Sequence, residues 1–537
     1  MIRRLWLSKG WKKCYSFFIM KPSDPEESRR GAASPEPKRR WLLLLILSAV
    51  ILRSPAFFNP IIDEDEAWYA TAACVINSGG LLYRNAVDLK PPLIFYFYAF
   101  GFSIFGDDLR LLHGVTVLWV LATAAFIGRI TTHLTQSWKA AYLAAWLYVL
   151  FTPNFVPQAL STNGEILMNL PLAISVFLFL QSARDRSKAY LALSGFFCGL
   201  AFLFKYQCGI LLAVISGHIF FNKADRGKQN LLVIGGFASV LIFFYGCFRY
   251  LGNWEDFYFW GWKYNLVFME EFTWRYFFKR FFGMTPRFIL IWLILWFFAF
   301  VVIKKALRRA PEINANHHLI ILWLIGSALA VCAGGKFFGH YFIQLLPPLT
   351  VLAGAAIADW WPACNAKWKR LVVLAGIVIP PIIYLGVNWQ EEQKRMRREN
   401  QYFQTIAAEV RKLSSPDDKI FVWGRMPELY YFSQRLPASR FITGNFVVGM
   451  TTYNFDDAAA KYDSAKTLPM LDWLMDDLIK NRPKLIIDTS PANFRQYGKY
   501  PIPSIAPLRE FIKKNYHFVV SVDRVTIYKS GEVRLGR

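Results

Sequence analysis

Apolar residues in this chain come in runs of about twenty, separated by short polar segments, and not in one-sided helical or alternating patterns. The runs WLLLLILSAVILRSPAFF at 41–58 and FILIWLILWFFAFVVI at 288–303 are apolar on every face of a helix. Runs of this length span the hydrocarbon core of a bilayer, and a helix that is apolar all round is buried in lipid or protein. The pattern predicts a polytopic α-helical membrane protein.

The connections between the apolar runs carry most of the Lys and Arg residues, which collect in the cytoplasmic loops of membrane proteins. Basic clusters recur at 129–139, 184–188, 223–228, 304–309 and 367–370. With these clusters and the basic N-terminus inside, the chain is expected to cross the membrane eleven times and to end outside. The expected spans are 41–59, 110–131, 138–156, 168–183, 189–204, 207–221, 231–250, 285–303, 317–333, 341–358 and 370–388.

A shorter apolar segment, PPLIFYFYAFGFSIFG at 91–106, is expected to lie as a helix in the outer interface of the membrane. It is short for a span, and this placement keeps every basic connection inside. It then belongs to a first outer loop of residues 60–109. The sixth span is also short, so the count is open by one pair of spans, which does not change the side of the C-terminus.

Both ends of the chain differ from the apolar middle. The first forty residues are basic and rich in Pro and Ser, which predicts a disordered cytoplasmic tail. From residue 389 the composition is that of a soluble domain, with strands at 419–424 and 484–490, a terminal hairpin at 517–530 and amphipathic helices between them. The expected parts are a tail (1–40), a transmembrane domain (41–388) and a small extracytoplasmic α/β domain (389–537).

The net charge of +25 in 537 residues could indicate a nucleic-acid partner. The basic residues lie mostly in the short connections, however, where membrane topology explains them, so no nucleic acid is expected. The seven cysteines are scattered without metal-ligand spacing, and none lies in the C-terminal domain. Neither a disulfide framework nor a zinc site is expected.

Unusual polar residues gather on the outer side of the predicted topology. The stretch NPIIDEDEAWYA at 59–70 holds four consecutive carboxylates, Asp63, Glu64, Asp65 and Glu66. The segments VDLKPPL, STNGEIL, FKYQ and GGKFFGHYF contribute further candidates, which are Asp88, Lys90, Glu165, Lys205, Lys336, His340 and Tyr341.

Ionisable groups at the edge of a hydrocarbon layer cost free energy unless they pair, face water or bind a ligand. Carboxylates can deprotonate a hydroxyl, and cationic side chains can hold a phosphate. A site that combines them at the level of the lipid headgroups favours group transfer from a lipid-linked phosphate. Structural roles stay open as alternatives: a solvated helix N-terminus for Asp63 and Glu64, headgroup contact for Lys90, a helix cap for Glu165, and interface anchoring for Lys205, Lys336 and His340.

The motifs DEAWYA, GGLLYRNAVDLKPPLIFYFYAFGFSIFG, RLLHG and GGKFFGHYFIQLLPPL, taken in this order, resemble the bacterial membrane glycosyltransferases of the GT-C fold. The resemblance is closest to the protein O-mannosyltransferase-like superfamily (glycosyltransferase family 39 or 83 type), which includes the aminoarabinose and galacturonic acid transferases. It covers about residues 40–360. The acidic motif by itself is a weak indicator of the family, and its occurrence together with KPPL and GHYF makes the resemblance more specific.

The resemblance implies roles for individual residues. Asp65 matches the base that activates the acceptor, with Glu66 beside it, and Lys90 matches the lysine that contacts the donor phosphate. Glu165 matches an acidic residue on the acceptor or metal side of the cavity, and Asp88 is grouped with it. The remaining candidates for donor phosphate binding are Lys205, Lys336, His340 and Tyr341.

The expected donor in such a family is a polyprenyl-phosphate sugar, and the reaction inverts the anomeric centre. The chain departs from the aminoarabinose branch because Asp88 stands two residues before Lys90 and not directly before it. Whether the site uses a divalent metal therefore stays open, since lysines can neutralise the phosphate without one.

The sequence thus predicts an inverting glycosyltransferase of the cytoplasmic (inner) membrane with an extracytoplasmic site. It would move a sugar from a polyprenyl phosphate to a hydroxyl of a lipid, polysaccharide or protein acceptor. A transporter or flippase of lipid-linked saccharides is the main alternative, although transporters usually carry ionisable residues near the midplane. A noncatalytic subunit of a glycan assembly complex is the other.

Overall fold

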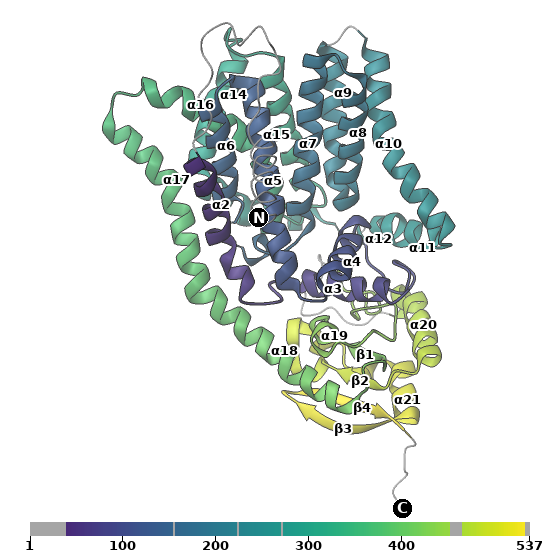
Figure 1. Cartoon of the computed structure of the whole chain (residues 1–537). Helices are drawn as coiled ribbons and strands as arrows, with labels where there is room; N and C mark the ends of the chain where they lie inside the picture. Colours follow the sequence, from purple (N-terminus) through teal and green to yellow (C-terminus); the bar gives the residue numbers. More distant parts are fainter. Residues whose placement is uncertain (1–38, 154–155, 223–224, 270–271, 452–463, 532–537) are drawn as a thin grey trace, which may run out of the picture.

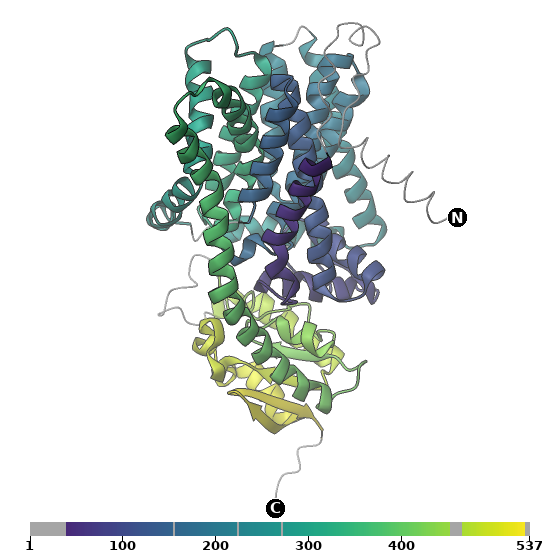
Figure 2. The same ribbon diagram turned by 60° about the vertical axis from the view of Figure 1, so that its left-hand side comes forward.

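The structure, a computed structural model, describes residues 39–153, 156–222, 225–269, 272–451 and 464–531. The predicted N-terminal tail lies outside these residues except for its last two positions. An upright helical bundle forms one part of the molecule, and a small α/β domain lies below one end of it (Figure 1). A long helix runs from the bundle into this domain (Figure 2).

Eleven helices of the bundle overlap the predicted spans, but the eighth span, 285–303, is wrong as a single helix, because it crosses the 86° bend between α13 (Trp274–Ile291) and α14. These helices are α2 (Arg39–Arg53), α5 (Leu109–Thr135), α6 (Trp138–Phe151), α7 (Gly164–Asp185), α8 (Lys188–Phe204), α9 (Ile210–Asn222), α10 (Arg226–Tyr250), α14 (Leu293–Leu307), α15 (Ala315–Cys332), α16 (Leu346–Ala363) and α17 (Lys367–Val387).

Seven helices of the described residues are long and apolar enough to cross a membrane. An eighth candidate is the pair α13 (Trp274–Ile291) and α14, which are bent by 86° relative to each other. Helices α6, α8 and α9 are apolar but shorter. The polytopic helical class is confirmed, and the count of eleven spans stays a prediction.

The outward faces of the bundle are apolar. On α10, the side chains of Leu231, Ile242 and Phe243 are largely exposed, and on α17 the same holds for Leu371 and Ile382. Apolar faces of this extent suit contact with lipid tails and not with water.

Short helices form a layer across the end of the bundle that faces the α/β domain (Figure 1). They are α3 (Glu64–Asn77), α4 (Leu93–Phe105), α11 (Trp254–Tyr258) and α12 (Tyr264–Met269). Helix α4 is the apolar segment predicted to lie in the interface. Residues 60–109, predicted to be the first outer loop, therefore contribute α3 and α4 to this layer, and α11 and α12 come from the connection between α10 and α13.

The α/β domain contains a four-stranded sheet in the order β1-β2-β4-β3. Strand β1 (Ile420–Trp423) pairs in parallel with β2 (Leu485–Asp488), with Ile420 opposite Leu485. Strands β3 (Tyr516–Val522) and β4 (Val525–Ser530) form the predicted terminal hairpin. The helices of the domain are α18 (Gln393–Leu413), α19 (Glu428–Ser433), α20 (Ser464–Asn481) and α21 (Ala506–Asn515).

No break separates the bundle from this domain. Helix α17 continues through one π-helical turn, η7 (Asn388–Glu392), into α18, so that one helical rod covers Lys367–Leu413. The domain boundary predicted at residue 389 falls inside this rod. The apolar composition does end there, but the following QEEQKRMRRENQ consists largely of strong helix formers, so the helix continues.

Candidate active site

The candidate side chains come from five segments that meet where the α3–α4 layer covers the end of the bundle. Helix α3 contributes Asp65, and the loop before α4 contributes Asp88 and Lys90. Glu165 lies in the first turn of α7, and Lys205 lies between α8 and the 3₁₀ turn η4 (Tyr206–Gly209). Lys336, His340 and Tyr341 lie between α15 and α16, the last two in the 3₁₀ turn η6 (Gly339–Leu345).

Asp65 and Lys90 form an ion pair, with 2.9 Å between Lys90 Nζ and Asp65 Oδ1. Tyr69, one helical turn after Asp65, donates a hydrogen bond from its hydroxyl to Asp65 Oδ2 at 3.4 Å. The Lys90 ammonium also lies 4.6 Å from the centroid of the Tyr69 ring. The side chains of the ion pair remain about one-third exposed, 33% for Lys90 and 36% for Asp65, so a substrate can reach them.

The loop before α4 fixes the position of Lys90. Asp88 is buried, and its Oδ1 accepts a hydrogen bond from the Lys90 backbone N at 2.9 Å. Tyr83 donates a hydrogen bond from its hydroxyl to the carbonyl of Lys90 at 2.7 Å. Pro91 and Pro92 follow, and Pro92 is the N-cap residue of α4.

The ion pair shifts the pKa values of both partners. Burial raises the pKa of Asp65, but the charge and hydrogen bond of Lys90 oppose it, and with His340 and Lys205 they lower this pKa to about 2. Burial lowers the pKa of Lys90, and the charges of Asp65 and Asp88 raise it above its usual value. Asp65 is therefore ionised and Lys90 charged at neutral pH.

Glu165 and Lys205 form a second, more buried pair, in which Lys205 Nζ hydrogen-bonds to Glu165 Oε1. His340 Nε2 lies 3.7 Å from the same oxygen, and Lys205 Nζ lies 4.0 Å from the centroid of the Tyr341 ring. Gly164 allows the backbone of α7 to approach that of α8 closely, because a Cβ at this position would lie 3.1 Å from the carbonyl oxygen of Phe204. The start of α7 can therefore lie against the end of α8.

Lys336 connects the two pairs electrostatically. Burial lowers the pKa of Lys336, and the charges of Lys205 and Lys90 lower it further, to about 8. These side chains shift one another's pKa values and so form one group. We call this group the charged cluster; its members are Asp65, Asp88, Lys90, Glu165, Lys205, Lys336, His340 and Tyr341.

Glu66 points away from the charged cluster. It is fully buried, and its carboxylate accepts hydrogen bonds from the backbone N of Ile62 at 3.0 Å and of Thr162 at 2.7 Å. His113 Nε2 lies 2.9 Å from Glu66 Oε1, and His113 Nδ1 lies 2.8 Å from the carbonyl oxygen of Ala56. Glu66 thus ties the start of α3 to α5 and to the second outer loop, beside Asp65.

The interpretation of Asp63 and Glu64 as a solvated helix N-terminus is wrong for Glu64. The side chain of Glu64 is only 12% exposed and pairs with Arg425 and Arg495 of the α/β domain. Asp63 accepts a hydrogen bond from Gln158 Nε2 at 3.3 Å. Burial raises the pKa of Asp63, and the neighbouring carboxylates raise it further, to about 8.

Sequence reasoning missed three contributors to the site, Tyr69, Trp68 and His113. The signal for Tyr69 was its spacing of four residues from Asp65, and His113 lies in the RLLHG motif. Trp68 Nε1 is buried and has no hydrogen-bond partner among the described residues, and the Lys90 ammonium lies 5.8 Å from the centroid of the Trp68 ring. A buried N–H donor beside the Lys90 ammonium suits an anionic ligand such as a phosphate.

The side chains of the charged cluster suit a metal ion less well than a phosphate. Among the described residues, no three side chains of His, Cys, Asp or Glu are grouped to hold a metal ion. Asp65 and Glu165 each bind a lysine instead.

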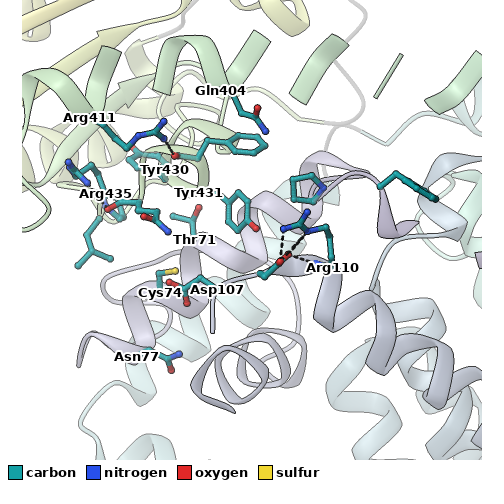
Figure 3. A pocket seen from close by; sticks show the side chains of 17 residues that line it. Thr71, Cys74, Asn77, Asp107, Arg110, Gln404, Arg411, Tyr430, Tyr431 and Arg435 are labelled. Atoms are coloured by element: carbon teal, nitrogen blue, oxygen red, sulfur yellow. Dashed lines mark hydrogen bonds and ion pairs between the residues drawn. The ribbon is translucent and has the colours of Figure 1, made fainter. Parts of the chain in front are cut away.

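A separate cleft of about 850 Å³ lies between the opposite face of α3 and the α/β domain (Figure 3). Thr71 and Cys74 of α3 line it on one side, and Tyr431 and Arg435 line it on the other. Arg110 also lines the cleft and pairs with Asp108. The cleft shares no residue with the charged cluster.

One family model matches part of this chain. It is described as dolichyl-phosphate-mannose-protein mannosyltransferase and matches residues 89–247, which include Lys90, Glu165 and Lys205. A comparison with curated protein sequences gave no significant match.

The chain shares its fold with solved structures. ArnT from Cupriavidus metallidurans bound to undecaprenyl phosphate matches with a TM-score of 0.58 and 14% identity, over 93% of this chain and 100% of that one. The apo state of the same ArnT matches with a TM-score of 0.62 and 13% identity, over 91% and 98%. The oligosaccharyltransferase AglB from Archaeoglobus fulgidus, in complex with an inhibitory peptide and a dolichol-phosphate, matches with a TM-score of 0.50 and 13% identity, over 93% and 75%. The GT-C fold expected from the sequence is confirmed.

Proposed function

We propose that this chain, which has the fold of the GT-C glycosyltransferases, is an inverting glycosyltransferase that uses a polyprenyl-phosphate sugar. It would transfer the sugar to a hydroxyl of a lipid, polysaccharide or protein acceptor. The observation that carries the proposal is the ion pair of Asp65 and Lys90, partly exposed within a cluster that holds two further lysines. One group can take a proton there while its neighbours hold a phosphate.

The lysines would bind the donor. Lys90, Lys205 and Lys336 can neutralise the phosphate, and the N–H of Trp68 supplies one more donor. When a phosphate competes for Lys90, Asp65 loses part of the charge that lowers its pKa. Donor binding would thus make Asp65 a stronger base at the moment when a base is needed.

Transfer would be a single displacement. Asp65 takes the proton of the acceptor hydroxyl while the acceptor oxygen forms a bond to C1 of the sugar. The bond between C1 and the phosphate oxygen breaks, and its electron pair leaves with the polyprenyl phosphate. The lysines stabilise the charge that develops on this leaving group. One displacement inverts the configuration at C1.

The proposed location is the cytoplasmic membrane, with the cluster and the α/β domain on its outer face. Support comes from the basic connections 129–139 and 184–188, which lie at the end of the bundle opposite the α/β domain (Figure 1). Ionisable side chains of the cluster gather at one end of the bundle and not midway, which favours an enzyme over a transporter.

The test is a transfer assay with the full-length protein in lipid nanodiscs and a panel of polyprenyl-phosphate sugars. Release of polyprenyl phosphate together with formation of a glycosylated acceptor would support the proposal. Asp65→Asn should lower the rate by at least about 100-fold. Full activity of Asp65→Asn would overturn the assignment of the base, and transport of intact donor without cleavage would favour a flippase.

A further inference from the structure

The α/β domain contacts helix α3 at Glu64, the residue directly before Asp65. We infer that this domain is a positioning element, and that Arg425 and Arg495 hold the proposed base in place through Glu64. The inference rests on the proposed function and adds a role for the α/β domain, whose described residues contribute no side chain to the charged cluster.

The contact is a buried network of four charged side chains. Arg425 Nε lies 2.7 Å from Glu64 Oε1, and Arg495 Nε lies 3.6 Å from Glu64 Oε2. On its other side Arg495 binds Glu428, with 2.6 Å from Nη2 to Oε1 and 3.2 Å from Nη1 to Oε2. The Glu428 side chain is 1% exposed and the Glu64 side chain 12% exposed, so water screens this network weakly.

The backbone around Arg495 is held in an unusual conformation. Asn493, Arg495 and Gln496 have φ values of 50°, 49° and 61°, in the left-handed region that residues with a side chain rarely adopt. Asn493 Oδ1 accepts a hydrogen bond from the Gly498 backbone N at 2.8 Å, and Arg495 Nη1 donates to the Arg425 carbonyl at 2.9 Å. Strained backbone of this kind is retained where it places a side chain for a purpose.

Further hydrogen bonds attach the domain to the same loop. Before Asp65, Asn400 Nδ2 of α18 donates to the carbonyl of Ile61 at 2.9 Å. Before Lys90, the backbone N of Val87 donates to the carbonyl of Arg440 at 3.0 Å. The α/β domain therefore holds the chain close to both partners of the catalytic ion pair.

Asp65 lies between two fixed neighbours. Glu64 is bound to the α/β domain, and Glu66 is bound to His113 and Thr162 on the bundle side. Successive residues of a helix point in different directions, so fixing both neighbours leaves Asp65 with one direction, towards Lys90. Since a displacement of about 1 Å at a reacting group can cost about 100-fold in rate, loss of the Glu64 contact should reduce turnover.

The experiment compares Glu64→Gln and Arg495→Lys with Arg509→Ala in full-length protein in nanodiscs. The pair of Arg509 and Glu510 is exposed on the same domain and touches neither Glu64 nor its partners, so it controls for general effects on the domain. The readouts are kcat, the KM for donor and the Kd for undecaprenyl phosphate. For Glu64→Gln we expect kcat to fall by about 10- to 100-fold, with KM and Kd within about threefold of the wild type.

A charge swap, Glu64→Arg with Arg425→Glu, should recover part of the lost kcat if the pairing itself matters. If Glu64→Gln does not fold, Arg425→Lys keeps the charge but alters the hydrogen-bond geometry and gives the same test. A folded Glu64→Gln protein with unchanged kcat would overturn the inference while leaving the proposed function intact.

Absence of transfer by the wild type with every donor, together with intact binding of undecaprenyl phosphate, would overturn the proposed function instead. Hydrogen exchange of residues 61–70 would still report whether Glu64 holds this segment: faster exchange in Glu64→Gln supports the contact, and unchanged exchange contradicts it.

Discussion

Lys90 Nζ lies 2.9 Å from Asp65 Oδ1, although the two residues are 25 positions apart in the chain. The contact joins α3 to the loop before α4 and brings an acid and a base of opposite charge to a partly exposed place. Each partner shifts the pKa of the other.

Lys90→Met should change the pH dependence of the reaction as well as its rate. Lys90 is the main charge that lowers the pKa of Asp65, and its removal leaves burial, which raises this pKa, opposed by the charges of His340 and Lys205. The acid limb of kcat/KM, measured between about pH 4 and pH 8, should therefore move to higher pH. Lys90→Arg keeps the charge and should leave the limb in place. An unchanged acid limb in Lys90→Met would contradict the coupling.

Asp65→Asn should leave binding of undecaprenyl phosphate intact or strengthen it. The substitution removes the carboxylate that competes with phosphate for Lys90, and it leaves Lys205 and Lys336 unchanged. Titration calorimetry in nanodiscs would measure the Kd. Weaker binding by about tenfold or more would show that Asp65 contributes to the donor site and is not chiefly a base.

Affinity for a phosphate should fall as the pH rises through about 8, the pKa to which burial, Lys205 and Lys90 lower Lys336. Below this pH Lys336 is charged and attracts the phosphate, and above it Lys336 is neutral. Lys336→Arg should keep the affinity at higher pH, because guanidinium remains charged. Lys412→Arg, at an exposed residue of α18, serves as the control and should behave as the wild type.

Asp63→Asn should stabilise the protein at alkaline pH. The folded protein binds the Asp63 proton more tightly than the unfolded chain does, since folding raises the pKa from 3.8 to about 8. The stability that this proton provides is complete below pH 3.8 and is lost as the pH rises to about 8. Thermal unfolding should therefore show a gap between Asp63→Asn and the wild type that widens over this range. A gap that is independent of pH would exclude this explanation.

Glu66→Gln should lower stability, whereas Asp65→Asn should not. Glu66 is buried and accepts three hydrogen bonds or ion-pair contacts, and an amide cannot reproduce them all. Leaving a buried hydrogen-bonding group without its partner costs about 1–3 kcal/mol. Chemical or thermal unfolding would measure the loss. Normal stability with a loss of activity as large as that of Asp65→Asn would instead indicate direct participation in catalysis.

The sequence predicts the helices of the bundle well because a bilayer requires apolar runs of a fixed length. It also predicts the charged cluster, since ionisable groups at the edge of the hydrocarbon must pair or bind. Lys90, Glu165 and Lys336 could be assigned to one site because all three are ionisable and lie on the predicted outer side, even though their partners were not known.

Other parts of the site had no local pattern to reveal them. The contact of Glu64 with Arg425 joins residues 361 positions apart, and no local pattern links the acidic run to the loop after β1. The direction of Glu66 depends on where α5 places His113, which the acidic run itself does not encode. Tertiary packing decides such contacts, and periodicity along the chain does not report it.

The helical rod over Lys367–Leu413 couples the two parts of the molecule by rotation as well as by distance. Each residue of a helix adds about 1.5 Å and about 100° of turn. Inserting one residue near η7 would therefore rotate Arg425 and its neighbours away from Glu64 without altering a single side chain of either group. The number of residues in this rod is itself a determinant of the site, because it sets the phase at which the α/β domain meets α3.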